Sequence, residues 1–246
     1  MTGDTSRPVA LLTGVGRPES IGAGIARRLA ATHDLALVYL PAYDERVHGA
    51  AGDLDAVRSE LESLGADVTM IECDLADAQA AASVMGRVPR PASVLVLSHC
   101  ESVDSSILDT TVESFDRHYA VNVRATWLLI RDFALQAPGY GRIVGLTSDH
   151  VVHNLPYGAT KGALDRVVLA AARELSDRRI TSNVVNPGPV DTGWMTEEIR
   201  ESGRQQTPAG RLGTPDDVAA VVAFLCSDEG GWINGQLIHA DGGFSA

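Results

Sequence analysis

Three polar residues past the middle of the chain have types and a spacing that could move a proton. The stretch SDHVVHNLPYGATK contains Ser148, then Tyr157 nine residues later and Lys161 four residues after the tyrosine. Residues four apart on a helix lie on one face, one turn from each other. A phenol has an unperturbed pKa of about 10, and a nearby ammonium favours its ionised form. The pair therefore indicates general acid–base chemistry, although a packing tyrosine beside a solvated lysine would show the same spacing.

A second stretch has the composition of a phosphate-binding turn. TGVGRPESIGAG, Thr13 to Gly24, follows an apolar run and precedes IARRLAA, which has helical periodicity. Glycines let a ligand approach the backbone, and free N–H groups at a helix start attract phosphate. Because the turn follows the first strand expected in the chain, it indicates a dinucleotide site and not only a tight turn.

Short apolar runs alternate with longer helical segments along the chain. The expected strands are Val9 to Thr13, Leu35 to Leu40, Val68 to Cys73, Ser93 to Ser98, Arg142 to Thr147, Thr181 to Asn186 and Gln236 to Ala240. The expected helices are Gly22 to Ala31, Leu54 to Leu64, Gln79 to Arg87, Val112 to Gln136, Tyr157 to Leu175 and Pro215 to Ser227. This alternation is typical of βαβ units on a parallel sheet that is buried on both faces. With no repeat or linker in 246 residues, the sequence predicts one α/β domain over residues 1–246.

The composition restricts the classes of partner. The formal net charge of -12 disfavours nucleic acid and anionic membranes, because phosphate binding requires clustered Lys and Arg. The longest apolar run, Val218 to Cys226, is far shorter than the roughly 20 residues that cross a bilayer, and the N-terminus has no signal-peptide core. The three cysteines are widely spaced, which indicates neither a disulfide framework nor a metal site. We therefore expect a cytoplasmic protein without nucleic-acid or membrane partners.

Further motifs follow in a set order. CDLAD contains Asp74, AVNVRA contains Asn122, NPGPVDT spans Asn186 to Thr192, and the C-terminal stretch from GRLGTPDD to DGGFSA is rich in glycine. Together with the glycine-rich turn and the Tyr-x3-Lys pair, they resemble the short-chain dehydrogenase/reductase family of NAD(P)-dependent oxidoreductases, and its 3-oxoacyl-carrier-protein reductases in particular. The resemblance covers nearly the whole chain. It implies a three-layer Rossmann fold with a doubly wound parallel sheet of about seven strands.

The resemblance implies a cofactor site built from loops at the carboxyl ends of the strands. The residues that it assigns to the cofactor are Gly14, Arg17, Ser20, Ile21, Gly22, Asp74, Leu75, Ser98, Tyr157, Lys161, Pro187, Gly188, Val190 and Thr192. Asp74 is expected at the adenine amino group, although a helix cap would also explain it. The segment from Pro187 to Thr192 is expected at the nicotinamide carboxamide. Two departures stand out: Ser20 replaces the middle glycine of a longer turn, and the stretch from Leu97 to Cys100 replaces the family's N-N-A-G.

The type of cofactor depends on the residues that meet the 2′ position of the adenosine ribose. A carboxylate binds the free 2′-hydroxyl of NAD, and a basic group binds the 2′-phosphate of NADP. After the second expected strand the chain has no acid until Asp44. Arg17 in the turn, assisted by Arg46, therefore favours NADP(H) over NAD(H). Asp44 or Glu45 would favour NAD(H) if either side chain folded back onto the ribose.

The resemblance also implies catalytic roles. Tyr157 is the general acid and base, and Lys161 lowers the pKa of Tyr157 and holds the ribose hydroxyls. Ser148 hydrogen-bonds the substrate oxygen, and Asn122 connects the lysine to solvent through a water. The family places its serine thirteen residues before the tyrosine, so Thr147 is an alternative donor and the pocket loop is shortened. Polar residues in and near this loop, namely Glu101, Asp149, His150 and His153, suggest a polar substrate.

We therefore expect an enzyme that interconverts a small-molecule carbonyl, such as a 3-oxoacyl thioester, and a secondary alcohol, assembled as a homotetramer or homodimer. Two alternatives stay open. An enoyl reductase is suggested by the ending Ser20-Ile21-Gly22, but that branch places six residues between its tyrosine and lysine, and the position concerned is Leu164. A non-catalytic NAD(P)-binding regulatory protein is suggested by the lost N-N-A-G.

Overall fold

Seven parallel strands form one sheet in the computed structural model, which describes residues 6–246; the first five residues of the expected domain lie outside it. The strands are β1 (Val9–Thr13), β2 (Asp34–Tyr39), β3 (Val68–Glu72), β4 (Ala92–Leu97), β5 (Gly141–Leu146), β6 (Ile180–Asn186) and β7 (Leu237–His239). Their order is β3-β2-β1-β4-β5-β6-β7, and every pairing is parallel. The predicted fold class and the seven predicted strands are confirmed: the bounds of β1 agree, and no end of another strand differs by more than one residue.

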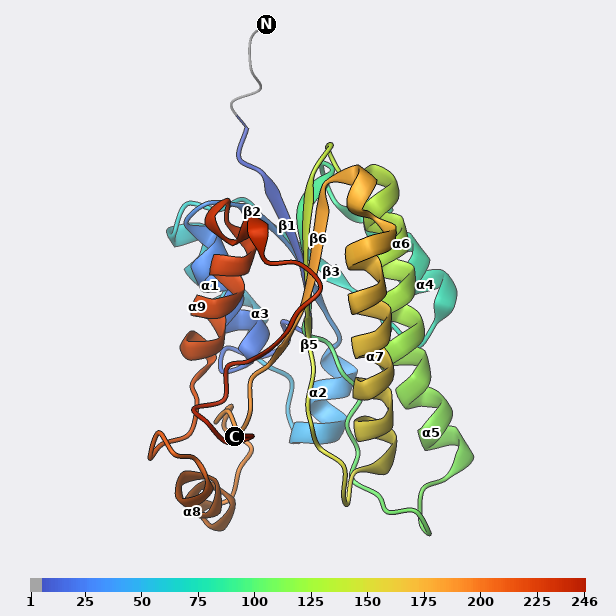
Figure 1. Ribbon diagram of the computed structural model, residues 1–246. Coiled ribbons are helices and arrows are strands. Elements are labelled where there is room, and N and C mark those ends of the chain that lie inside the picture. The colour runs from blue at the N-terminus through green and yellow to red at the C-terminus, as the bar shows by residue number, and fades with distance from the viewer. Residues whose placement is uncertain (1–5) are drawn as a thin grey trace, which may run out of the picture.

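Helices cover both faces of the sheet (Figure 1). One layer contains α1 (Ile21–Ala30), α3 (Leu54–Ser63) and α9 (Pro215–Cys226). The other contains α4 (Ala78–Ser83), α5 (Val112–His118), α6 (Thr126–Gln136) and α7 (Leu155–Glu174). Successive residues of β1 serve opposite layers: Leu11 packs with the core of the second layer, and Ala10 and Leu12 pack with that of the first. A strand buried on both sides explains the continuous apolar runs in the sequence.

The long central helix differs from the single α-helix that the periodicity predicts over Val112 to Gln136. A π-helical segment over Tyr119–Ala125 joins α5 to α6. The buried residue Asn122 lies inside this segment. Such π-segments widen a helix locally and often occur at functional sites.

Two short helices were not predicted from the sequence. They are α2 (Pro41–His48) and α8 (Glu197–Gln206). Both are mainly polar: Asp44 is the buried residue of α2, and no residue of α8 is buried. An apolar stripe is the main sequence signal of a helix, so these segments give almost none. Figure 1 places α2 below the carboxyl ends of the central strands, between the two helix layers.

The strand order reverses beside β1, which lies between β2 and β4. In open α/β sheets, ligands bind in the crevice outside the carboxyl ends of the strands at such a switch point. The loops after β1, β4, β5 and β6 therefore form the part of the molecule where a site is expected.

Candidate active site

The start of α7 places Tyr157 and Lys161 against the carboxyl end of β5. Pro156 stands in the first turn, where its fixed φ suits a helix start. Lys161 is buried, and its Nζ donates a hydrogen bond of 2.8 Å to the carbonyl of Leu146, the last residue of β5. The same Nζ lies 5.5 Å from the centre of the Tyr157 ring. The predicted pair is thus one turn apart on one face, and that face is turned toward the strand end.

Ser148 and Thr147, the two candidate donors, point in different directions. The Ser148 hydroxyl accepts a hydrogen bond of 3.2 Å from the His150 N–H, and it lies close enough to the Tyr157 phenol to lower the pKa of that group. Thr147 is buried, and its hydroxyl donates to the Lys161 carbonyl at 3.4 Å. The structure therefore brings Ser148, and not Thr147, to the phenol.

The ionisation of the pair differs from the expected lowering of the Tyr157 pKa by Lys161. Burial raises the pKa of the Tyr157 phenol, and the neighbouring Cys100 adds to the rise, while the Ser148 hydrogen bond opposes it. Burial lowers the pKa of the Lys161 ammonium, and Cys100 and Asp165 oppose that change. Desolvation is the largest cause of both changes in pKa, because removing a charge from water is costly. At neutral pH, Tyr157 therefore carries its proton and can donate it.

Asn122 holds the loop after β4 next to this pair. Its Oδ1 accepts from the Glu101 N–H at 2.7 Å, and its Nδ2 donates to the Glu101 carbonyl at 3.0 Å. Nδ2 also donates to the Thr160 hydroxyl at 2.9 Å, beside Lys161. The predicted buried polar role of Asn122 agrees with these contacts. Thr160 is a site residue that the sequence analysis missed, because a threonine inside an apolar helix carries no distinctive signal.

The turn after β1 fits the pyrophosphate of a dinucleotide. Gly14 has φ +77°, and a Cβ at this position would lie 2.6 Å from the Ser98 carbonyl oxygen. A Cβ on Gly22 would lie 2.5 Å from the Gly14 carbonyl oxygen. Ser20, in place of the family's glycine, caps α1 by accepting from the Ala23 N–H at 3.1 Å. The turn therefore leads to the start of α1 at the carboxyl end of the sheet, where the N–H groups of Ile21 and Gly22 in the first helical turn can bind an anion.

Arg17, the expected ligand of a 2′-phosphate, is engaged by the protein itself. Its Nε lies 3.5 Å from Oδ1 of Asp44, and its Nη1 donates to the Thr192 carbonyl at 3.1 Å. Asp44 is 6% exposed, and burial raises the pKa of its carboxyl while Arg17 opposes that rise. The acid that follows β2 therefore folds back, and it contacts the glycine-rich turn.

A charged cluster lies between the loops after β3 and β4. Glu101 is 2% exposed, and Arg46 and Arg117 donate to its carboxylate at 2.8 and 3.1 Å. Arg117 also pairs with Asp74 at 3.3 Å. Asp74 also accepts from the Ala76 N–H at 2.9 Å, but it is not the helix cap, because α4 begins at Ala78 and Asp77 is its N-cap. Arg46, expected to assist at a 2′-phosphate, is instead paired with Glu101, and the sequence analysis did not identify this cluster because its members lie far apart in the chain.

The residues that replace N-N-A-G join β1 to the central helix. His99 is buried, with its Nδ1 2.6 Å from the Thr13 hydroxyl and its Nε2 3.1 Å from the Val121 carbonyl. Burial, with a smaller effect of the Lys161 charge, lowers the pKa of His99 to about 3, so the imidazole is neutral. The half-buried Ser98 and Cys100 keep their backbone at the edge of the crevice. The bulky His99 side chain therefore points into buried contacts with Thr13 and Val121, while the backbone at Ser98 and His99 lies against Gly14 of the glycine-rich turn.

The remaining predicted cofactor residues follow the strand ends. Leu75, after β3, is buried. In the loop after β6, Gly188 has φ +61°, and a Cβ there would overlap the Asp241 side chain. Val190 pairs with Gly213 in an isolated bridge. Pro187 and Thr192 lie in the same loop, and the Thr192 carbonyl accepts a hydrogen bond from Arg17. Pro187, Gly188, Val190 and Thr192 therefore lie together in the loop after β6, at the carboxyl end of that strand.

The shortened loop after β5 is exposed and mixed in character. His150 and His153 are exposed, but the intervening Val151 and Val152 are 77% and 67% exposed. Ser105 pairs with Asn154, so the loop after β4 runs beside this loop. That second loop carries Ile107 and Leu108, which are also exposed. The surroundings of Ser148 are therefore less polar than the sequence analysis expected.

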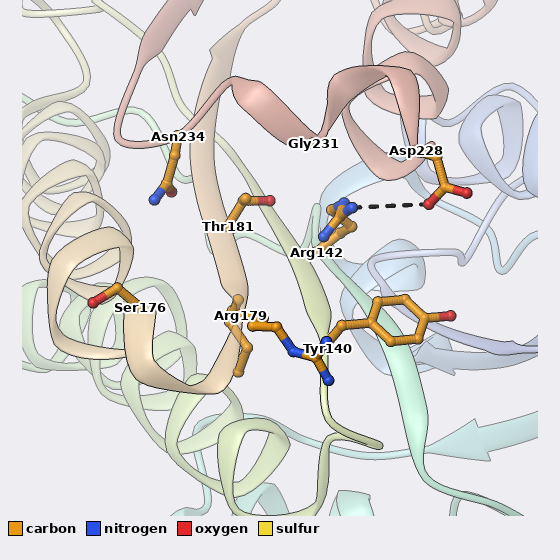
Figure 2. Close-up of a pocket in the computed structure, with 9 residues that line it drawn as sticks. Tyr140, Arg142, Ser176, Arg179, Thr181, Asp228, Gly231 and Asn234 are labelled. Atoms are coloured by element: carbon orange, nitrogen blue, oxygen red, sulfur yellow. Dashed lines mark ion pairs between the residues drawn. The ribbon is translucent and has the colours of Figure 1, made fainter.

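A cavity of about 610 Å³ opens at the opposite edge of the sheet. Its lining includes Arg142 at the start of β5, Thr181 at the start of β6 and Asp228 (Figure 2). Because Tyr157 and Lys161 lie at the carboxyl ends of the strands, this cavity is separate from the candidate active site. Among residues 6–246, no helix has the length and apolar character to cross a membrane, and no group of His, Cys, Asp and Glu side chains could hold a metal ion.

Comparison with known proteins identifies close similarities over nearly the full length. A family model described as Enoyl-(Acyl carrier protein) reductase matches residues 14–245. The uncharacterized oxidoreductase YjdA of Bacillus subtilis (strain 168) is 35% identical over 247 residues, covering 96% of each chain. NADPH-dependent aldehyde reductase 2, chloroplastic, of Arabidopsis thaliana is 35% identical over 254 residues, covering 96% of this chain and 93% of the plant protein.

A solved structure shares the fold. The crystal structure of a short-chain dehydrogenase from Burkholderia cenocepacia J2315 in complex with NADP has a TM-score of 0.86 and 33% sequence identity. The match covers 98% of each chain. The similarity thus extends over both helix layers and the whole sheet.

Proposed function

This chain belongs to the short-chain dehydrogenase/reductase family of oxidoreductases, and we propose that it interconverts a carbonyl and a secondary alcohol with NADP(H). The observation that carries the proposal is the arrangement of Ser148, Tyr157 and Lys161 at the carboxyl end of β5. A hydrogen-bonded hydroxyl, a phenol and a buried ammonium in this order can move one proton to or from a substrate oxygen.

In the reductive direction, Tyr157 donates its proton to the carbonyl oxygen of the substrate. The raised pKa of the phenol keeps the acid form populated at neutral pH. The Ser148 hydroxyl, which lies beside the Tyr157 phenol, binds the same oxygen and stabilises the charge that develops on it. The nicotinamide supplies the hydride when it is bound. In the oxidative direction the phenolate takes the proton back.

Lys161 and Asn122 support the proton transfer. The Lys161 ammonium is fixed by the Leu146 carbonyl near the Tyr157 ring, where it stabilises the phenolate that remains after donation. In the proposed complex it also binds the ribose hydroxyls. Asn122, held by both backbone groups of Glu101 and by Thr160, completes the path by which Lys161 regains a proton through water.

The preference for NADP(H) rests on Arg17, which stands in the middle of the glycine-rich turn that would bind the phosphates. The names of the Arabidopsis relative and of the Burkholderia structure, which state NADPH and NADP, support it. We further propose a cytoplasmic homotetramer or homodimer built from a single domain, with a substrate that has an apolar portion next to Val151 and Val152.

An enoyl reductase is the second candidate, favoured by the description of the matching family model and by the ending Ser20-Ile21-Gly22. The distance of one helical turn between Tyr157 and Lys161 supports the carbonyl reductase instead. The test is NADPH and NADH oxidation, followed by absorbance, against a panel of aldehydes, ketones, 3-oxoacyl thioesters and enones. Turnover of carbonyls supports the proposal, and turnover of enones alone contradicts it. NADPH binding without turnover of any class would instead favour a regulatory protein.

A further inference from the structure

Helix α2 lies below the carboxyl ends of the central strands, between the two helix layers (Figure 1). The helix begins directly after β2, and its residues contact segments that follow β1 and β4. Asp44 reaches Arg17 in the turn after β1, and Arg46 reaches Glu101 in the loop after β4. Because β1 lies between β2 and β4, α2 crosses the end of β1, where a dinucleotide binds in an open α/β sheet.

The segment fits closely on the glycine-rich turn. A Cβ on Gly16 would overlap the Asp44 carboxylate, and a Cβ on Gly52 would overlap the Gly16 carbonyl oxygen. The Tyr43 hydroxyl lies 3.9 Å from Sγ of Cys100. The Arg46 guanidinium, 5.4 Å from the centre of the Tyr43 ring, covers it from above. Residues 41–52 therefore contact both the glycine-rich turn and the loop after β4, beside the switch point where a dinucleotide binds in such a sheet.

The contacts that hold α2 in this place are polar. The buried residue of the helix is a carboxylate, Asp44, and its partner is the guanidinium of Arg17. The two ends of the helix suit a hinge. The helix begins at Pro41, after the extended Leu40, and ends before Gly49, which has φ +83° and no atom within 4 Å of a Cβ built at that position. A short element that buries little apolar surface separates from a fold at low cost. Separation of α2 from the turn would therefore expose little apolar surface.

We propose that α2 is a lid on the cofactor groove, that Asp44 fastens it to Arg17, and that a dinucleotide with a 2′-phosphate opens it. Asp44 is then a residue that determines which cofactor enters. The phosphate dianion binds the guanidinium of Arg17 in place of Asp44, and it repels the Asp44 carboxylate. Cofactor binding and opening of the lid are therefore coupled. The free 2′-hydroxyl of NADH neither displaces Asp44 from Arg17 nor repels the Asp44 carboxylate. This inference rests on the proposed use of NADP(H) by the same groove.

A lid reduces the apparent affinity for the cofactor by the fraction of molecules in the open state. The Asp44→Asn variant removes the charge that fastens the lid. We expect its dissociation constant for NADPH, measured by isothermal titration calorimetry, to fall at least about fivefold, the lower end of typical coupling between states. NADH should bind Asp44→Asn no more weakly than it binds the unmodified protein.

Glu45→Gln is the matched control, because Glu45 is an exposed neighbour on the same helix and the charge change is equal. It should leave both dissociation constants unchanged. Arg46→Met provides a second test if Asp44→Asn does not fold, since Arg117 still holds Glu101. It should also tighten NADPH binding, whereas Arg58→Met, which removes an exposed i,i+4 pair on α3, should not.

The outcomes separate the lid from the proposed function. If the unmodified protein binds NADPH and Asp44→Asn binds it no more tightly than Glu45→Gln does, the lid is refuted and the oxidoreductase stands. If Asp44→Asn weakens NADH binding, Asp44 accepts a hydrogen bond from the ribose and is not a fastener. If neither the unmodified protein nor Asp44→Asn binds NADPH or NADH, the proposed function itself fails.

Discussion

Replacing Asn122 with leucine should destabilise the protein strongly, because one side chain satisfies both backbone groups of Glu101. The side chain accepts at 2.7 Å and donates at 3.0 and 2.9 Å, and all of it is buried. Leucine has a similar volume but leaves the Glu101 N–H and carbonyl unpaired. A buried polar group without a partner costs about 1–3 kcal/mol. Two such groups give a loss of about 2–6 kcal/mol in the free energy of unfolding.

The assay is urea denaturation followed by circular dichroism, with Thr126→Val as the comparison. Thr126 donates one hydrogen bond of 2.9 Å to the Asn122 carbonyl, and its hydroxyl makes a long contact of 3.5 Å with Nε2 of His99; valine has nearly the same shape. That variant should lose only about 1 kcal/mol, because one hydrogen bond contributes about that much. If Asn122→Leu costs no more than Thr126→Val, the loop after β4 does not depend on Asn122. The positioning role of Asn122 would then be refuted.

Two further predictions concern pH and cofactor choice. The pKa of His99 is lowered to about 3 from 6.5, so its contribution to stability is complete above pH 6.5 and is lost as the pH falls towards 3. Urea midpoints should show roughly 2 kcal/mol of His99-dependent loss between pH 7 and pH 5 that His99→Gln lacks, and equal losses in both proteins would show that His99 is not buried neutral. Arg17→Ala should raise the dissociation constant for NADPH much more than that for NADH, as measured by calorimetry, and equal increases would reject the contact with a 2′-phosphate.

The sheet and its covering helices were predictable because their cores leave a periodic signal. The runs in β1 and β4 are buried on both faces, and α1 and α7 carry apolar stripes that pack on them. Tyr157 and Lys161 were predictable because both lie within two turns of one helix start. Local spacing is preserved in the sequence, so such pairs can be found without a structure.

The contacts that differ from expectation join segments distant in the sequence. The Asp44 to Arg17 pair and the Glu101 cluster depend on where α2 lies, and a polar eight-residue helix has no pattern that reveals its partners. The direction of the Tyr157 pKa was wrong for a related reason. Spacing shows that a lysine is near, but only the fold shows how much water both groups have lost.

The most direct test of the proposed chemistry compares Tyr157→Phe with Tyr140→Phe on a carbonyl substrate found in the panel. Tyr140 lies near the opposite edge of the sheet and controls for the loss of a hydroxyl. Tyr157→Phe should lower kcat by at least about 10²-fold, the contribution of a general acid, while the dissociation constant for NADPH stays within about twofold. Tyr140→Phe should change neither. An unchanged kcat in Tyr157→Phe would contradict proton donation by Tyr157.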